Sequence, residues 1–422
     1  MSAPRVAFVN LGCRVNRVEV DLIAQELARA GCVIVKPEEA DAVVVNTCAV
    51  TAEAEAKTRK VVRRAASLGQ VPVVVATGCV ASLFSDELAS IAPNVTVEAD
   101  KSRVSETVLG ELGLPAGSVG DDGELVATPT PTGRVRPGIK VQDGCDNRCT
   151  YCIVWKARGA ARSMGSGEVV SAVRDALSRG AREVVLTGIN LGSFRGTCAG
   201  GGRIALPGLL ELVLRETTVE RVRLSSIEPP DVDGELLSVM AANPARIAPF
   251  LHVCLQSGCD ATLRRMGRVY DTALYRTAIA RAREMVPGIA VGCDLIVGFP
   301  GETDDDFERS LAFCAEMDFA KMHVFRYSRR PGTPAASAPD QVGPDVMAAR
   351  SSRMRALADH MRHDQAARRV GQEELVVVQR PGRGVTGGLF DVRLDASVPV
   401  DALVRVRIGA VMENGTLVAV GA

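Results

Sequence analysis

Residues 141–152 read VQDGCDNRCTYC, which places three cysteines at a CxxxCxxC spacing on one short glycine-containing stretch. Packing alone gives no reason for thiols at this spacing. Thiolates usually hold a [4Fe–4S] cluster in sets of four, so a set of three leaves one iron open to a small molecule. We therefore expect Cys145, Cys149 and Cys152 to bind such a cluster. A zinc site completed by a distant residue is the alternative, and a disulfide is disfavoured because three is an odd number.

A second set of three cysteines lies in the first hundred residues. Cys13, Cys48 and Cys79 each follow a short apolar run, and each is followed by a helical pattern, at residues 17–30, 51–67 and about 82–92. Strands that alternate with helices predict a parallel sheet, and the loops after such strands gather at one edge. The three thiols should therefore converge. A second cluster then explains them better than three unrelated buried cysteines.

Composition limits the class of protein. A length of 422 residues suggests two or three domains. Fifty basic and fifty acidic residues cancel, so any contact with nucleic acid must come from local patches. No run reaches the ~18 apolar residues of a membrane span, and the N-terminus has no signal-peptide pattern. We therefore expect a cytoplasmic protein without membrane contact.

The rest of the chain predicts an α/β protein in successive parts. Residues 1–110 form the parallel-sheet domain, and residues 111–135, rich in Pro, Gly, Thr and Asp, form a linker. Strands and helices alternate about six times over residues 136–370, which predicts a full or partial (β/α) barrel with its site at the carboxyl edge. Short strands with Gly and Pro turns over residues 371–422 predict a small all-β barrel.

The CxxxCxxC motif, with Tyr151 before its last cysteine, resembles the radical S-adenosylmethionine superfamily. Three later segments, LTGIN at 186–190, SSIEP at 225–229 and DLIVGFPGET at 294–303, agree with it in order and position. The resemblance implies a partial (β/α) barrel in which S-adenosylmethionine completes the open iron site. The residues implied to bind this cofactor are Tyr151, Thr187, Gly188, Asn190, Ser225, Glu228, Gln256, Asp294 and Gly298.

The N-terminal motifs narrow the resemblance. NLGCRVN at 10–16, NTCAVT at 46–51 and Gly78-Cys79 are similar to the methylthiotransferases, which carry a second [4Fe–4S] cluster on three cysteines of a flavodoxin-like domain. The terminal barrel resembles their TRAM domain. Patterns ending at Glu19 and Arg59 most resemble the bacterial branch that methylthiolates C2 of N6-threonylcarbamoyladenosine at position 37 of tRNA. The resemblance implies S-adenosylmethionine as both radical source and methyl donor, and no single protein side chain is predicted to be catalytic.

The same resemblance implies several partners: the tRNA anticodon loop, an electron donor such as flavodoxin or ferredoxin, and a source of sulfur. Isopentenyladenosine in tRNA and an aspartate of a ribosomal protein are the alternative substrates. Outside this chemistry, an iron–sulfur electron carrier and a zinc-stabilised RNA-binding module are the competing classes. Basic residues that either contact tRNA phosphates or lie on solvated helix faces are Lys57, Arg59, Lys60, Arg350 and Arg353.

Overall fold

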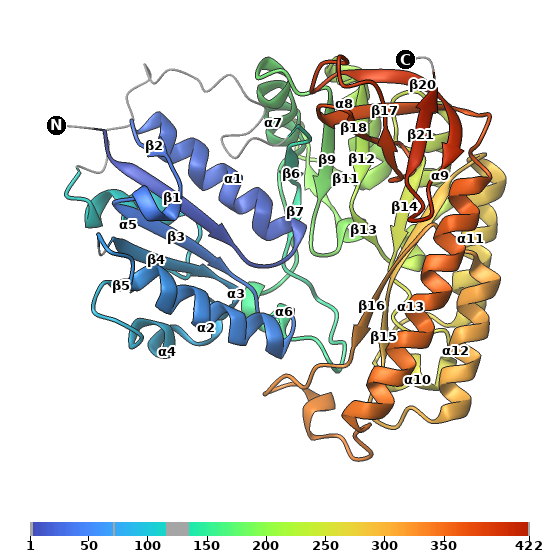
Figure 1. The fold of residues 1–422 in the computed structure, drawn as a ribbon, viewed down its shortest axis with the longest axis horizontal. Helices are drawn as coiled ribbons and strands as arrows, with labels where there is room; N and C mark the ends of the chain where they lie inside the picture. The colour runs from blue at the N-terminus through green and yellow to red at the C-terminus, as the bar shows by residue number, and fades with distance from the viewer. Residues whose placement is uncertain (1–2, 71, 115–134, 421–422) are drawn as a thin grey trace.

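The computed structural model describes residues 3–70, 72–114 and 135–420. Its N-terminal part is a five-stranded parallel sheet covered by helices on both faces (Figure 1). The strand order is β2-β1-β3-β4-β5, which is the flavodoxin-like order. The strands are β1 (Arg5–Asn10), β2 (Val33–Ile34), β3 (Ala42–Thr47), β4 (Val73–Gly78) and β5 (Val95–Val97).

Alternate side chains of these strands build two cores. One core packs under α1 (Arg14–Arg29) and α5 (Val104–Glu111), and the other under α2 (Ala52–Ala66). The sequence predicts one helix near 82–92, but the structure has two short helices, α3 (Cys79–Leu83) and α4 (Ser85–Ala89). Phe84 separates them because its backbone, at φ −141° and ψ 49°, is not helical.

The central part is a partial barrel of two parallel sheets. The first has the order β12-β9-β6, and the second has the order β13-β14-β15-β16. Within the described residues, β6 and β16 are edge strands, so the barrel does not close. The strands are β6 (Gly138–Lys140), β9 (Glu183–Thr187), β12 (Arg221–Leu224), β13 (Ser226–Ile227), β14 (Phe250–Val253), β15 (Ala290–Val297) and β16 (Lys321–Arg326).

Helices cover the outside of this partial barrel. Val291, Cys293 and Leu295 of β15 pack outward into the large core beneath the helices, whereas the alternating Asp294 and Ile296 are only half buried. The covering helices are α7 (Ser166–Ser178), α8 (Leu206–Glu216), α9 (Gly234–Ala242), α10 (Asp260–Arg265), α11 (Thr272–Met285) and α12 (Asp304–Met317).

A long helix, α13 (Pro344–Ala367), leads to a closed five-stranded barrel. This barrel packs on the amino ends of the central strands, because Phe250, Ala290 and Ala320 share a core with its Val376 and Phe390. It therefore leaves the carboxyl ends of the central strands accessible to the N-terminal part. The barrel strands are β17 (Glu373–Arg380), β18 (Arg383–Thr386), β19 (Asp391–Arg393), β20 (Leu403–Val411) and β21 (Leu417–Val420).

The structure confirms the predicted fold class, a mixed α/β protein with a parallel-sheet domain, a partial barrel and a terminal β-barrel. Among the short strands expected over residues 371–422, the apolar pattern favours one over residues 389–394, but β19 covers only Asp391–Arg393, and no pattern indicated β18. Most of the predicted linker falls on residues 115–134, outside the described residues. In the described part of the chain, no helix is both long and apolar enough to cross a membrane.

Candidate functional site

The N-terminal cysteines lie at the carboxyl ends of three adjacent strands. Cys13 follows β1, Cys48 follows β3, and Cys79 follows β4 as the first residue of α3. Burial, together with the nearby thiols of Cys79 and Cys13, raises the pKa of Cys48 to about 11. Gly12 packs directly on Cys48, since a Cβ there would lie 2.8 Å from the Cys48 Cβ. The structure therefore brings the three thiols together.

Polar side chains beneath these thiols hold the three loops in place. The Thr47 hydroxyl donates to the carbonyl of Thr77 at 2.6 Å and accepts from the amide of Val80 at 3.0 Å, which fastens β3 to the start of α3. The Asn16 side-chain amide donates to the Thr47 carbonyl at 2.8 Å, which fastens α1 to the same loop. The positions of the cysteines are therefore set by hydrogen bonds between strands as well as by the sheet.

The second triplet lies on the loop between β7 (Gln142–Asp143) and α6 (Val154–Arg158). Gly144 has φ +69°, and a Cβ there would lie 2.0 Å from the Ala160 carbonyl, so only glycine fits this turn. Burial, together with the thiols of Cys149 and Cys145, raises the pKa of Cys152 to about 11. These three thiols also lie together.

Both triplets fit a metal cluster by the chemistry of their donors. Each presents three soft sulfur ligands in a partly buried site, which is the kind of donor set that binds iron–sulfur clusters. Two such sets fit two clusters that each keep an open iron. They do not fit a saturated electron carrier, which normally supplies a protein ligand to every iron.

Arg158 joins the two triplets, and the sequence did not indicate it. Its guanidinium donates to Glu19 and Asp143, at 2.8 and 2.9 Å, and to the Asn16 side chain at 2.8 Å. Asn16 and Glu19 lie on the helix that follows Cys13, whereas Asp143 lies two residues before Cys145. A buried ionic network therefore holds the two thiol loops at a set separation.

This network predicts that the stability of the fold depends on pH. Although burial acts to raise it, the hydrogen bonds and charge of Arg158, with Lys101 and Lys140, lower the pKa of Glu19 from 4.5 to about 2. The carboxylate therefore stabilises the fold above pH 4.5, and this contribution of about 3 kcal/mol is lost as the pH falls towards 2. In urea unfolding of the iron-free chain between pH 4.5 and pH 2, the free energy of unfolding should fall less steeply for Glu19→Gln than for the wild type. Parallel curves would contradict the assignment.

Three of the residues implied to bind S-adenosylmethionine carry buried oxygens that lack a hydrogen-bond partner within the described chain. They are Thr187 Oγ1, Asn190 Oδ1 and Ser225 Oγ. Buried polar atoms are nearly always paired in folded proteins, and an unpaired one is costly. A polar ligand at the carboxyl ends of β9 and β12 would satisfy these atoms, so this edge of the barrel fits the cofactor.

Gln142 supports the segment after β9 that contains Gly188 and Asn190. The sequence did not single out this residue. Its side-chain oxygen accepts from the amide of Asn190 at 2.9 Å. A Cβ at Gly188 would lie 2.8 Å from that oxygen, so the close approach requires glycine. The position of Gln142, three residues before Cys145, was the one feature of the sequence that could have indicated its role.

Glu228 and Tyr151 lie beside the second triplet. Glu228 accepts from the Asn147 side chain at 3.0 Å and pairs with Arg268, which also donates to Cys149 Sγ at 2.9 Å. Tyr151 packs edge-on against Phe299, with ring centroids 6.2 Å apart. The carboxylate of Glu228 therefore helps to hold the motif loop, in addition to any contact with the cofactor.

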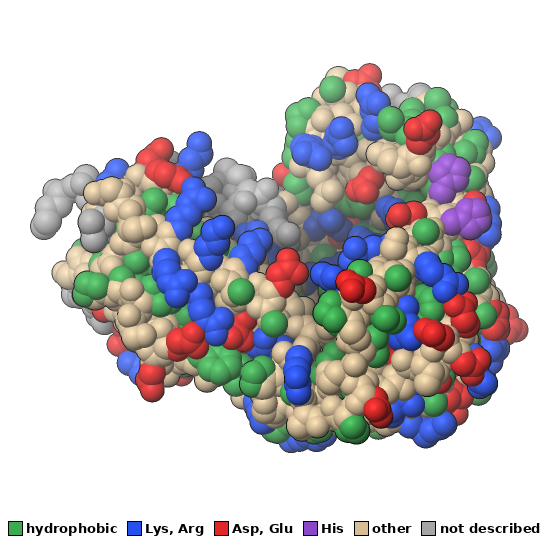
Figure 2. Space-filling view, turned by 60° about the horizontal axis from the view of Figure 1, so that its bottom comes forward, with side chains coloured by type: hydrophobic (Ala, Val, Ile, Leu, Met, Phe, Trp, Pro, Cys, Tyr) green, Lys and Arg blue, Asp and Glu red, His purple; other side chains and the backbone are tan. Residues whose placement is uncertain are grey.

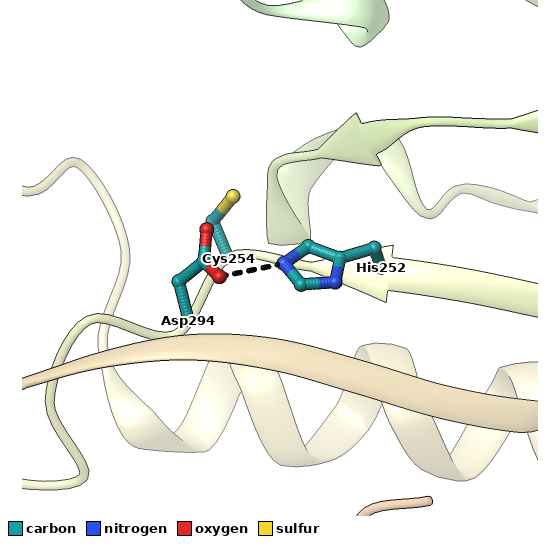
Figure 3. A group of neighbouring side chains, drawn as sticks. All are labelled: His252, Cys254 and Asp294. Carbon is teal, nitrogen blue, oxygen red and sulfur yellow. Dashed lines mark ion pairs between the residues drawn. The ribbon is translucent and has the colours of Figure 1, made fainter. Parts of the chain in front are cut away.

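Asp294 lies on β15 of the second sheet, Gln256 follows β14, and Gly298 directly follows β15. Gln256 has φ +66°, a strained conformation for a residue other than glycine, and its amide donates to the Asp294 carbonyl at 2.8 Å. The amide of Gly298 donates to Glu302 at 2.9 Å. Asp294 Oδ1 lies 3.1 Å from His252 Nε2, with Cys254 close by (Figure 3), and 3.0 Å from His323 Nδ1.

The expected tRNA contacts divide into two groups. Lys57 and Lys60 are exposed on α2, and Figure 2 shows Lys and Arg side chains gathered over the N-terminal part of the molecule. Arg59 pairs with Glu55 and Glu87, and Arg353 pairs with Glu308. These two arginines are therefore partly neutralised within the chain.

The expectation for Arg350 needs correction. Its side chain is buried and pairs with Glu302 and Asp304, both at 2.7 Å. Glu302 in turn accepts from the Gly298 amide, so Arg350 holds the loop after β15. A phosphate contact would break these buried bonds.

Comparison with known families gives two matches along the chain. Residues 139–314 match the radical SAM superfamily, and residues 5–99 match a family described as uncharacterized protein family UPF0004. The solved structure of the radical S-adenosylmethionine methyltransferase TsrM from Kitasatospora setae superposes with a TM-score of 0.55 at 16% identity. The match covers 79% of this chain and 77% of that chain, which supports the fold.

Three curated relatives are similar over most of their length. The chain is 36% identical to the threonylcarbamoyladenosine tRNA methylthiotransferase MtaB of Bacillus subtilis, over 86% of this chain and 82% of that protein. It is 35% identical to the ribosomal protein uS12 methylthiotransferase RimO of Desulforudis audaxviator, over 99% and 94%. It is 34% identical to the tRNA-2-methylthio-N(6)-dimethylallyladenosine synthase of Sphingopyxis alaskensis, over 89% and 86%. All three relatives are named for methylthio chemistry, but their names specify different substrates.

Proposed function

This chain belongs to the radical S-adenosylmethionine methylthiotransferase family, and from that premise we propose that it methylthiolates C2 of N6-threonylcarbamoyladenosine at position 37 of tRNA. The observation that carries the proposal is the pair of thiol triplets, joined through Arg158 and Glu19. The relative from Bacillus subtilis, whose name specifies this nucleoside, supports the substrate. The N-terminal patterns that end at Glu19 and Arg59 support the same branch.

Two [4Fe–4S] clusters are part of the proposal, one on Cys13, Cys48 and Cys79 and one on Cys145, Cys149 and Cys152. When bound, the cofactors supply an electron, sulfur and a methyl group, so the difficult chemistry is theirs. The protein positions them. Thr187, Asn190 and Ser225 would offer their unpaired oxygens to S-adenosylmethionine.

Other side chains of the site would orient the cofactors and the RNA. Gln142 holds the backbone at Gly188 and Asn190, and Arg158 keeps the two thiol loops in register. The exposed lysines Lys57 and Lys60 would contact phosphates of the anticodon stem-loop. An electron donor such as flavodoxin or ferredoxin and a source of sulfur complete the system.

Mass analysis of tRNA nucleosides tests the proposal. We expect tRNA from a strain lacking the gene to lose the 2-methylthio form of threonylcarbamoyladenosine and to accumulate the unthiolated nucleoside. Expression of the wild-type chain should restore the product. Unchanged product in the deletion strain, or loss of methylthio isopentenyladenosine instead, would show that the substrate is a different one.

A further inference from the structure

A basic cavity of about 330 Å³ lies between the three parts of the molecule. Its charged lining consists of four cations, Arg14, Arg136, Arg223 and Lys321, and one carboxylate, Asp391. Figure 2 shows a hollow between the N-terminal part and the rest of the molecule, with Lys and Arg side chains visible inside it. The size is in the range of small-molecule sites.

The cavity borders both halves of the candidate site. Arg14 directly follows Cys13 of the N-terminal triplet, and the lining also includes Thr187, whose hydroxyl has no partner among the described residues. An occupant would therefore contact Thr187, one of the residues proposed to bind the cofactor.

Lys321 is the cation that the rest of the described chain leaves without an ion pair. Arg223 is occupied, because it donates to Glu183 at 2.8 Å and to the Thr386 carbonyl at 3.0 Å. Arg136 lies 3.5 Å from Glu183. Burial lowers the pKa of Lys321, and the charges of Arg362, Arg14 and Arg136 lower it further against the opposing charge of Asp391, so the positive charges here outnumber the negative one. An anion in the cavity would relieve this repulsion.

The strand that carries Lys321 continues towards the carboxyl edge of the barrel. Side chains two residues apart on a strand point to the same face, so Lys321, His323 and Phe325 form one row along β16. Asp294 orients His323, and Phe325 is 41% exposed although it is a large apolar ring. The row therefore offers an aromatic surface for a base at Phe325 and a cation for a charged substituent at Lys321, four residues away along the same strand.

We propose that this cavity binds the anionic N6 substituent of the substrate base, with Lys321 as the residue that selects its carboxylate. The inference rests on the proposed function and adds a specificity site to it. A threonylcarbamoyl group carries a carboxylate, whereas an isopentenyl group is neutral. The cavity thereby favours the first over the second.

Binding of matched RNAs to the reconstituted enzyme tests this. Three anticodon stem-loops differ only at position 37, carrying threonylcarbamoyladenosine, its neutral methyl ester, or adenosine. We expect the wild type to bind the acid about tenfold more tightly than the ester, because one charge-assisted contact is at stake. Lys321→Gln should remove this preference, and Lys321→Arg should keep most of it.

Lys57→Gln serves as the control, because loss of an exposed cation should weaken all three RNAs by the same factor. Equal affinity of the wild type for the acid and the ester would overturn the proposal. The proposal would also be overturned if Lys321→Gln weakened the binding of all three RNAs equally, since that result indicates a contact with a backbone phosphate. If the proposed function itself is wrong, the wild-type enzyme will form no methylthio product from the RNA that carries threonylcarbamoyladenosine. Failure of the cavity assignment would leave wild-type turnover intact.

Discussion

Replacing Cys48 by alanine is expected to lower the iron of the reconstituted enzyme from about eight to about four atoms per chain, because one of two four-iron clusters loses a ligand. Methylthio product should disappear, while reductive cleavage of S-adenosylmethionine continues at the intact second triplet. Iron analysis and chromatography of both products measure the two effects.

Cys152→Ala should give the same loss of iron, but this variant should lose both the cleavage of S-adenosylmethionine and the methylthio product, because the product depends on the radical. Cys32→Ala is the matched control, since Cys32 is buried in the apolar core beneath α1, away from both triplets. It should keep all its iron. Full iron in Cys48→Ala would remove the N-terminal triplet from the scheme.

Replacing Arg158 by methionine should lower the free energy of unfolding of the iron-free chain by about 3–5 kcal/mol. The substitution leaves Glu19 and Asp143 buried with fewer partners, although Lys140 remains 3.1 Å from each. Trp155, the only tryptophan of the chain, lies on α6 with Arg158, so its fluorescence during urea unfolding reports on this region.

Two further variants isolate the ionic contribution. Addition of Glu19→Gln to Arg158→Met should recover part of the loss, because a buried charge is removed with its partner. Arg174→Met breaks an exposed pair with Glu216, and should cost less than about 1 kcal/mol. An Arg158→Met variant as stable as this control would show that the network does not hold the two parts together.

What the sequence does not show about the basic residues of this chain has one physical cause. Basic residues on a helix predict an RNA surface only if they face solvent, and sequence does not show which cations find carboxylates elsewhere. Arg350 was expected either to contact tRNA phosphates or to lie on a solvated helix face, but it is buried and pairs with Glu302 of the loop after β15. Arg59 likewise has a distant partner in Glu87. Lys321 was not identified because its surroundings come from all three parts of the fold.

The sequence by itself determined which residues can carry the chemistry. Thiol spacing is local, and the alternation of strands and helices orders the loops after β1, β3 and β4 along one edge, so the sequence pattern alone groups Cys13, Cys48 and Cys79. Only the tertiary structure decided how the two triplets are joined and what lies between them. Arg158 meets Glu19 across 139 positions of chain, and Lys321 shares its cavity with Arg14. Contacts of this kind depend on how separate parts pack, and no local pattern of residues records them.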